Sequence, residues 1–331
     1  MKPGVALSRD GDVETRFFIS QVYPSAPLTP QTVLGPLRFS LLNGSTYPNF
    51  LRAEPPPRLL KHWKKTFPRR SIPFSRSVVS IPPKSLVFPV VGRDSVERYG
   101  EAPPVETVTR DEGIENFLRY RKNHTVLTPF VGAVRTITCH FFLHPSFDVV
   151  WFGCTETRGS DDECCGPNNN SRTVIVLDEQ KALALPLIPI AKDLAQHFLS
   201  CASRDFWGFF GMEIAIDMDG KVAINCLRHG IHGACPALMA GLILRAHCGD
   251  YFSVGIFSDD ASVAYPGSAR DLLKQVEKCN KKTRPERIVI LSLMECGPKE
   301  TLVNAAVYGS SIQSCELVLS RIVRPLTTIA S

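Results

Sequence analysis

The chain has 331 residues, of which 44% are hydrophobic and 21% charged, and this balance is typical of a water-soluble globular protein with a sizeable core. Apolar runs stay shorter than the roughly 20 residues of a membrane helix, and residues 1–13 lack the apolar block of a secretory signal, so we expect a cytoplasmic protein with no membrane partner. The net charge of +6 is modest, and eleven scattered cysteines favour reduced thiols in a core over a disulfide framework.

Residues 1–80 are rich in proline, serine and arginine and have no sustained periodicity, which predicts irregular structure. Between Arg52 and Arg76 the chain holds eight Lys or Arg and one acid, Glu54. Such a segment favours a solvated surface over nucleic-acid binding, because no recognition module surrounds its basic residues. Nucleic acid is therefore not an expected partner.

The following segments alternate between strand and helix patterns. Strands are predicted at 86–91, 106–109 and 125–131, with a helix at 111–121 between the last two. Residues 135–142 and 149–153 predict a hairpin, and the polar segment 155–172 predicts a long loop. Helices are predicted at 190–203 and 234–247, and the start of the second helix offers backbone N–H groups to an anion.

Residues 206–228 carry the strongest functional signal of the chain. Apolar residues alternate on both sides of the Asp219-Gly220 dipeptide, which predicts two strands joined by a tight turn. Glu213 would lie on the first strand, with Asn225 and Arg228 near the end of the second. A carboxylate suits a cation and an arginine fork suits a phosphate or carboxylate, whereas the plain alternatives are a solvent-facing strand acid and a surface arginine.

This hairpin resembles the active-site hairpin of the ATP-grasp superfamily, in which an acid, a D-G-type turn and a pattern such as D/E-x-N-P-R follow one another. The chain keeps Glu213, the turn and Arg228, but neither register of Asn225 restores the second carboxylate. The resemblance implies that Glu213 and Asn225 hold Mg²⁺, weakly because an amide is neutral. It implies a catalytic role for Arg228.

Two upstream segments extend the resemblance to the nucleotide. Residues 126–132 are similar to the family's adenine-holding strand, V-x-E-P-F-I-x-G, which implies that ATP contacts Thr128, Pro129, Phe130 and Val131. Residues 86–91 are similar to F-P-V-V-V-K-P, but the phosphate-binding lysine is missing and Arg93 is the nearby cation. Arg135 stands where the family has a ribose-binding glutamate, and a guanidinium cannot accept those hydrogen bonds.

With a closing helix at 267–276 and strand at 287–292, the resemblance spans roughly residues 80–320. It implies an α+β, ATP-grasp-like fold, in which two lobes with antiparallel sheets enclose a nucleotide cleft behind an incomplete or irregular N-terminal domain. The implied divisions are an irregular N-terminal region at 1–80 and a small lobe at 81–136. A large lobe with the metal hairpin follows at 137–250, and a closing subdomain at 251–331.

The implied function is ATP- and Mg²⁺-dependent ligation of a carboxylate to an amine or thiol through an acyl phosphate. Small-molecule carboxylates and amines would then be the partners. The alternative is a non-catalytic ATP-grasp-like pseudoenzyme or binding protein, because three charged groups of the family pattern are missing. Each loss would cost about 2–4 kcal/mol of charge stabilisation.

Two groupings of histidine and cysteine have weaker functional interpretations. Zinc prefers such ligands, but the three-residue spacing of Cys226, His229, His232 and Cys235 fits no common zinc template, and structural roles are favoured. His140 and His144 flank two phenylalanines and are expected on an aromatic strand face, since the chain has no G-x-S-x-G nucleophile context.

Overall fold

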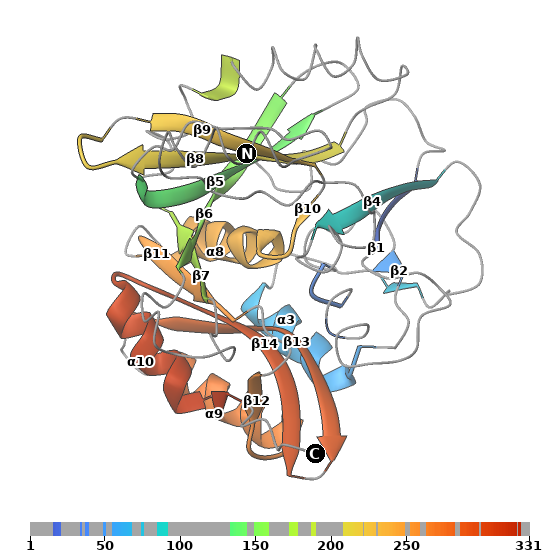
Figure 1. Ribbon diagram of the computed structural model, residues 1–331. Coiled ribbons are helices and arrows are strands. Elements are labelled where there is room, and N and C mark those ends of the chain that lie inside the picture. Colours follow the sequence, from blue (N-terminus) through green and yellow to red (C-terminus); the bar gives the residue numbers. More distant parts are fainter. Residues whose placement is uncertain are drawn as a thin grey trace, which may run out of the picture.

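The computed structural model shows a broad antiparallel sheet with helices packed against it (Figure 1). It describes residues 16–20, 34, 37–39, 49–50, 55–67, 74–75, 85–91, 133–143, 149–158, 172–177, 187–189, 208–220, 222–229, 231–248, 252–258, 263–281, 285–297, 299–322 and 324–325. Among the described helices, none is long and apolar enough to cross a membrane.

Ten strands form the main sheet, and every paired neighbour in it is antiparallel. Their order is β15-β12-β14-β11-β7-β6-β5-β8-β9, with β13 paired to β14 outside that path. The strands are β5 Ala133–Leu143, β6 Val149–Arg158, β7 Arg172–Val176, β8 Gly208–Asp217, β9 Val222–His229, β11 Val254–Phe257, β12 Val263–Tyr265, β13 Arg287–Gly297, β14 Glu300–Gly309 and β15 Arg324–Pro325.

Two small parallel sheets lie beside the main one. In the first, β4 (Ser85–Val91) pairs with β1 (Arg16–Ser20) and with β10 (Ile231–His232), which follows β9 directly. In the second, β2 (Asn49–Phe50) pairs with β3 (Phe74–Ser75). The strand predicted at 86–91 is therefore present, and it adjoins the end of the β8–β9 hairpin (Figure 1).

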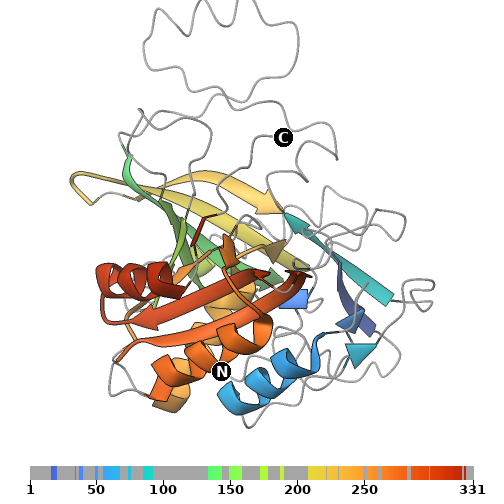
Figure 2. The same cartoon turned by 90° about the horizontal axis from the view of Figure 1, so that it is seen from below.

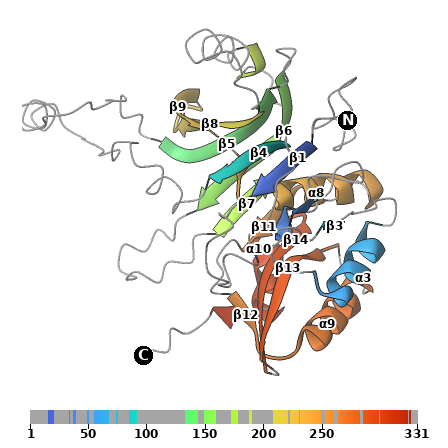
Figure 3. The ribbon, with the colours of Figure 1, turned by 90° about the vertical axis from the view of Figure 1, so that its right-hand side faces the viewer.

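Four helices complete the described fold: α3 Pro57–Thr66, α8 Cys235–Cys248, α9 Ala269–Lys281 and α10 Ile312–Ile322. Pro57 and Pro236 stand in the first turns of α3 and α8, where a missing N–H costs nothing. All four helices contribute to one large apolar core, and its largest fully buried side chain is Trp63 of α3. Figures 2 and 3 show α3 and α9 side by side.

Side chains of α3 and α9 cap the outer edge of β13. Asn280 donates to the carbonyl of Ile288 and accepts from its N–H, both at 2.9 Å. Two neighbouring residues of α3 bind the backbone of Ile290 in the same way. Trp63 Nε1 donates to its carbonyl at 2.8 Å, and His62 Nε2 accepts from its N–H at 3.2 Å. An open strand edge can pair with another chain and promote aggregation. The side chains of α3 and α9 cover this edge by binding its backbone groups.

The α+β class with an antiparallel sheet is confirmed, as are the hairpins at 135–153 and 206–228, the helix at 234–247 and the closing helix and strand. Within the region expected to be irregular, residues 57–66 form a helix because Leu59 and Trp63 bury one face of it. Residues 155–158, predicted to begin a loop, instead belong to β6, which continues to Arg158 by pairing with β7. Elements predicted between 92 and 132 and at 190–203 lie outside the described residues, and the lobe boundaries stay a prediction.

Candidate nucleotide and metal site

The β8–β9 hairpin turns where the sequence predicts. Gly220 has a φ of 77°, which a residue with a side chain rarely adopts, and its N–H donates to the carbonyl of Asp217 at 3.1 Å. The Asp217 carboxylate accepts the N–H of Asp219 at 2.9 Å, which makes a local side-chain turn. These bonds give Asp217 and Asp219 a structural role in the turn.

A β-bulge sits beside the candidate metal ligand. Glu213 of β8 pairs with Cys226 of β9, whereas the next residue, Ile214, pairs with Ile224. Asn225 is therefore the extra residue of the bulge, flanking the Glu213 position. Arg228 pairs with Gly211, two residues from Glu213 along β8. The hairpin thus brings the backbone positions of Glu213, Asn225 and Arg228 together, as predicted from the sequence.

Glu213 belongs to a row of oxygen-bearing residues that crosses three strands. It lies opposite Thr138 of β5, and Thr138 lies opposite Thr155 of β6. Residues directly opposite one another share a face of the sheet, so the carboxylate and both hydroxyls belong to the same face. Glu213 is only 9% exposed and Thr155 only 2%, which places them in a protected environment.

His140, in the adjacent row of this face, links Thr155 to helix α8. His140 Nε2 and Thr155 Oγ1 are 2.7 Å apart, and His140 Nδ1 lies 3.8 Å from the Sγ of Cys235, the first residue of α8. Helix α8 then crosses the face closely, because a Cβ on Gly153, whose φ is 140°, would come within 2.6 Å of Leu238. The start of α8 therefore lies next to the polar rows.

Neither His140 nor Thr155 was predicted on this face from the sequence. The histidine was expected on an aromatic strand surface and the threonine in a loop. Alternation along β5 was the available signal, since Thr136, Thr138 and His140 are polar residues at a period of two and must share a face. The contact with Cys235 spans 95 residues and left no local signal.

The opposite face of the same strands is a closed structural core. Cys139 and Cys154 lie opposite each other with sulfurs 3.4 Å apart, and the hydrogen bond between them, together with burial, raises the pKa of the Cys154 thiol far above its usual range. Arg135 Nη2 donates to Glu156 Oε2 at 3.0 Å across this face. Arg135 therefore lies on the other side of the sheet from Glu213, and it makes an ion pair instead of a ribose contact.

No protein-family model matches this chain, and no curated protein matches its sequence. Among solved structures, it is similar to the N5-carboxyaminoimidazole synthase of Aspergillus clavatus in complex with ADP and 5-aminoimidazole ribonucleotide, with 13% identity and a TM-score of 0.33 over 64% of this chain and 56% of that one. It is also similar to the N5-carboxyaminoimidazole synthetase of Staphylococcus aureus, with 10% identity and a TM-score of 0.40 over 93% and 96% of the two chains.

A third similar structure is the biotin carboxylase domain of 2-oxoglutarate carboxylase from Hydrogenobacter thermophilus, with 7% identity and a TM-score of 0.29 over 57% of this chain and 44% of that one. The N5-carboxyaminoimidazole synthetases and biotin carboxylases are ATP-grasp enzymes. This chain spans little more than half the length of the Aspergillus clavatus enzyme. At these scores the similarities assign neither a substrate nor an activity to it.

The side chains of the polar face suit a hard cation. Glu213 supplies a carboxylate and the two threonines supply neutral hydroxyls, and oxygen is the ligand atom that Mg²⁺ prefers. Asn225, whose backbone lies beside Glu213 at the bulge, also carries a neutral oxygen. Among the residues described by the structure, no group of three or more His, Cys, Asp or Glu could hold a metal ion. The remaining predicted nucleotide contacts lie outside the described residues: Arg93, Thr128, Pro129, Phe130 and Val131.

Proposed function

We propose that this protein binds ATP with Mg²⁺ at the β8–β9 hairpin and acts as an ATP-grasp ligase-like protein. The observation that supports the proposal is the row of Glu213, Thr138 and Thr155 on one protected sheet face, next to the bulge at Asn225. A carboxylate held among oxygen donors at low exposure attracts a divalent cation more strongly than one in water does, because the local dielectric is lower.

Each residue of the hairpin has a distinct part in this proposal. Glu213 supplies the negative charge of the metal site, and Asn225 adds a neutral oxygen at the bulge. Bound Mg²⁺ would neutralise charge on the phosphates of ATP. Arg228, two positions from Glu213 along the ladder, would hold a phosphate or a substrate carboxylate in its planar fork.

The proposed reaction joins a small-molecule carboxylate to an amine or thiol through an acyl phosphate. Arg93 is proposed to contact the phosphates, and Thr128, Pro129, Phe130 and Val131 the adenine. Such a reaction depends on positioning the reactants and on neutralising charge, and less on acid–base groups of the protein. Its two products other than the ligated molecule are ADP and inorganic phosphate.

A second candidate function is nucleotide binding without catalysis, and one observation favours it. Opposite Glu213 the ladder places Cys226, with Asn225 bulged beside it. Neither Ile224 nor Asn225, the two positions that can align with the second acid of the ATP-grasp pattern, is a carboxylate. Losing one charge-stabilising group costs about 2–4 kcal/mol, or roughly 10²–10³-fold in rate. A protein with this change can keep a bound nucleotide while turning over very slowly.

ADP release separates the two candidates. We expect a folded ligase to release ADP from ATP only when Mg²⁺ and a suitable carboxylate are both present, and a panel of small carboxylates with ammonium as the nucleophile would detect this. Binding of Mg·ATP without ADP release across the panel would favour the binding protein. Absence of nucleotide binding at millimolar concentration would contradict both.

A further inference from the structure

A second charged site lies far along the chain from the hairpin, in a cleft between α3 and α9. The cleft has a volume of about 420 Å³, which is within the range of small-molecule sites. Its wall includes Arg58, Lys61 and Lys65 from α3 and Arg270, Lys274 and Lys281 from α9. Arg287 of β13 also lines it. We call this cavity the α3–α9 cleft.

Helical spacing gathers these cations on facing surfaces. Residues 58, 61 and 65 recur at intervals of three and four, and so do residues 270, 274, 277 and 281, so each set forms one stripe along its helix. The two helices pack side by side (Figure 2). Facing stripes of like charge repel one another, so the packing of α3 on α9 is more favourable when an anion lies between them.

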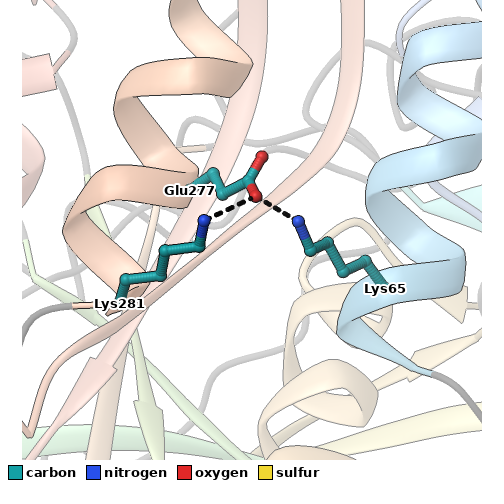
Figure 4. A network of polar contacts seen from close by, with 3 residues as sticks. All are labelled: Lys65, Glu277 and Lys281. Carbon is teal, nitrogen blue, oxygen red and sulfur yellow. Dashed lines mark hydrogen bonds and ion pairs between the residues drawn. The ribbon is translucent and has the colours of Figure 1, made fainter.

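One carboxylate already takes such a position. Oε1 of Glu277 contacts the ammonium groups of both Lys65 and Lys281, the latter at 3.2 Å, and therefore bridges the two helices (Figure 4). These contacts hold the pKa of Glu277 below its usual value. Among the described residues that line the cleft, Glu277 is the single acid, against seven cationic side chains.

Four of the other cations can serve a ligand. Within the described ranges, Arg58, Lys61, Arg270 and Lys274 form no ion pair. The imidazole of His62 accepts a backbone N–H of β13 and holds this part of α3 against the sheet edge. The cleft therefore combines a helix anchored to β13 with four exposed cations that have no ion pair.

We propose that the α3–α9 cleft binds a small polyanion that carries two or more phosphate groups. The four cations without an ion pair carry more positive charge than a single phosphate neutralises, and the cleft volume suits a small molecule better than a nucleic-acid strand. This site is separate from the hairpin site, since none of its lining residues belongs to β5, β6, β8 or β9. It does not depend on ATP binding at Glu213.

Calorimetric titration with tripolyphosphate tests this proposal. We expect one site per chain, and binding weakened about tenfold or more in the double variant Lys61→Ala/Lys274→Ala. The matched control is Lys64→Ala/Lys278→Ala, which removes the same charge from the same two helices at residues that do not line the cleft. Equal weakening in the two double variants would overturn the proposal, because binding would then depend on the net charge of the protein and not on the residues of the cleft.

Glu277→Gln provides a test by gain of binding. The substitution frees Lys65 and Lys281 and removes the competing carboxylate, so tripolyphosphate should bind several-fold more tightly, whereas unchanged or weaker binding would contradict a cleft site. Inorganic monophosphate should bind much more weakly than tripolyphosphate. If tripolyphosphate does not bind but single-stranded RNA binds in a way that depends on Lys61 and Lys274, the small-polyanion proposal is wrong and the ligand is a nucleic acid.

The hairpin variant Glu213→Ala separates this inference from the proposed function. Its tripolyphosphate affinity should equal that of the wild type, because Glu213 does not line the cleft. If Glu213→Ala abolishes tripolyphosphate binding while Lys61→Ala/Lys274→Ala leaves it intact, the anion binds at the hairpin, and the cleft proposal fails without harm to the nucleotide proposal.

Discussion

His62 shows how one buried side chain ties stability to pH. Its ring accepts the N–H of Ile290, and burial lowers its pKa from 6.5 to about 4, with Glu277 opposing this shift and Lys65 adding to it. Above pH 6.5 the ring is neutral in the folded and unfolded chains, so its full contribution is present. As the pH falls from 6.5 towards 4, the unfolded chain takes up a proton that the folded chain resists, and about 3 kcal/mol of unfolding free energy is lost.

The His62→Gln variant isolates this effect, since glutamine keeps an acceptor but does not titrate. Urea unfolding at pH 7.5 and pH 4.5 should show that the wild type loses about 2–3 kcal/mol more than the variant over this interval. Carboxylates elsewhere titrate equally in both proteins and cancel in the difference. Equal losses would mean that the ring is protonated in the folded protein.

Among elements, the edge strand β13 depends most clearly on side chains from elsewhere. Asn280 satisfies both backbone groups of Ile288, so Asn280→Ala leaves a donor and an acceptor at the edge without their partner. We expect a loss of about 1–3 kcal/mol in unfolding free energy. The Ile288 amide should also exchange hydrogen faster, as native-state exchange would reveal.

Gln275→Ala is the matched control, because this residue lies on the same helix and makes no described hydrogen bond to β13. We expect it to change stability by less than about 0.5 kcal/mol. If the two variants are equally stable and the Ile288 amide remains protected, the role assigned to Asn280 is wrong.

At the scale of the whole molecule, the sequence predicted those helices and strands that depend mainly on neighbouring residues. Alternation around Asp219-Gly220 predicted the hairpin, and its turn forms through Asp217 as such dipeptides allow. The helix α8 was also predicted from the sequence, and the resemblance to the ATP-grasp family predicted α9 and β13. Helix α3 was missed because its proline-rich, basic surroundings outweighed a two-residue apolar stripe, Leu59 and Trp63.

What the sequence could not provide were contacts between distant segments. The bulge at Asn225 depends on how β9 pairs with β8, and no local pattern sets that register. The meeting of His140 with Cys235 spans 95 positions, and that of Lys65 with Glu277 spans 212. Both the candidate site and the α3–α9 cleft are products of these long-range contacts.

Calorimetric titration of Mg·ATP into the wild-type protein and into Glu213→Ala tests the central proposal most directly. Glu300→Ala, an exposed acid on the distant β13–β14 hairpin, controls for loss of one negative charge. We expect wild type and Glu300→Ala to bind alike, and Glu213→Ala to bind at least about tenfold more weakly because the metal loses its carboxylate. Equal affinity in all three folded proteins would show that Glu213 holds no Mg·ATP and would contradict the hairpin site.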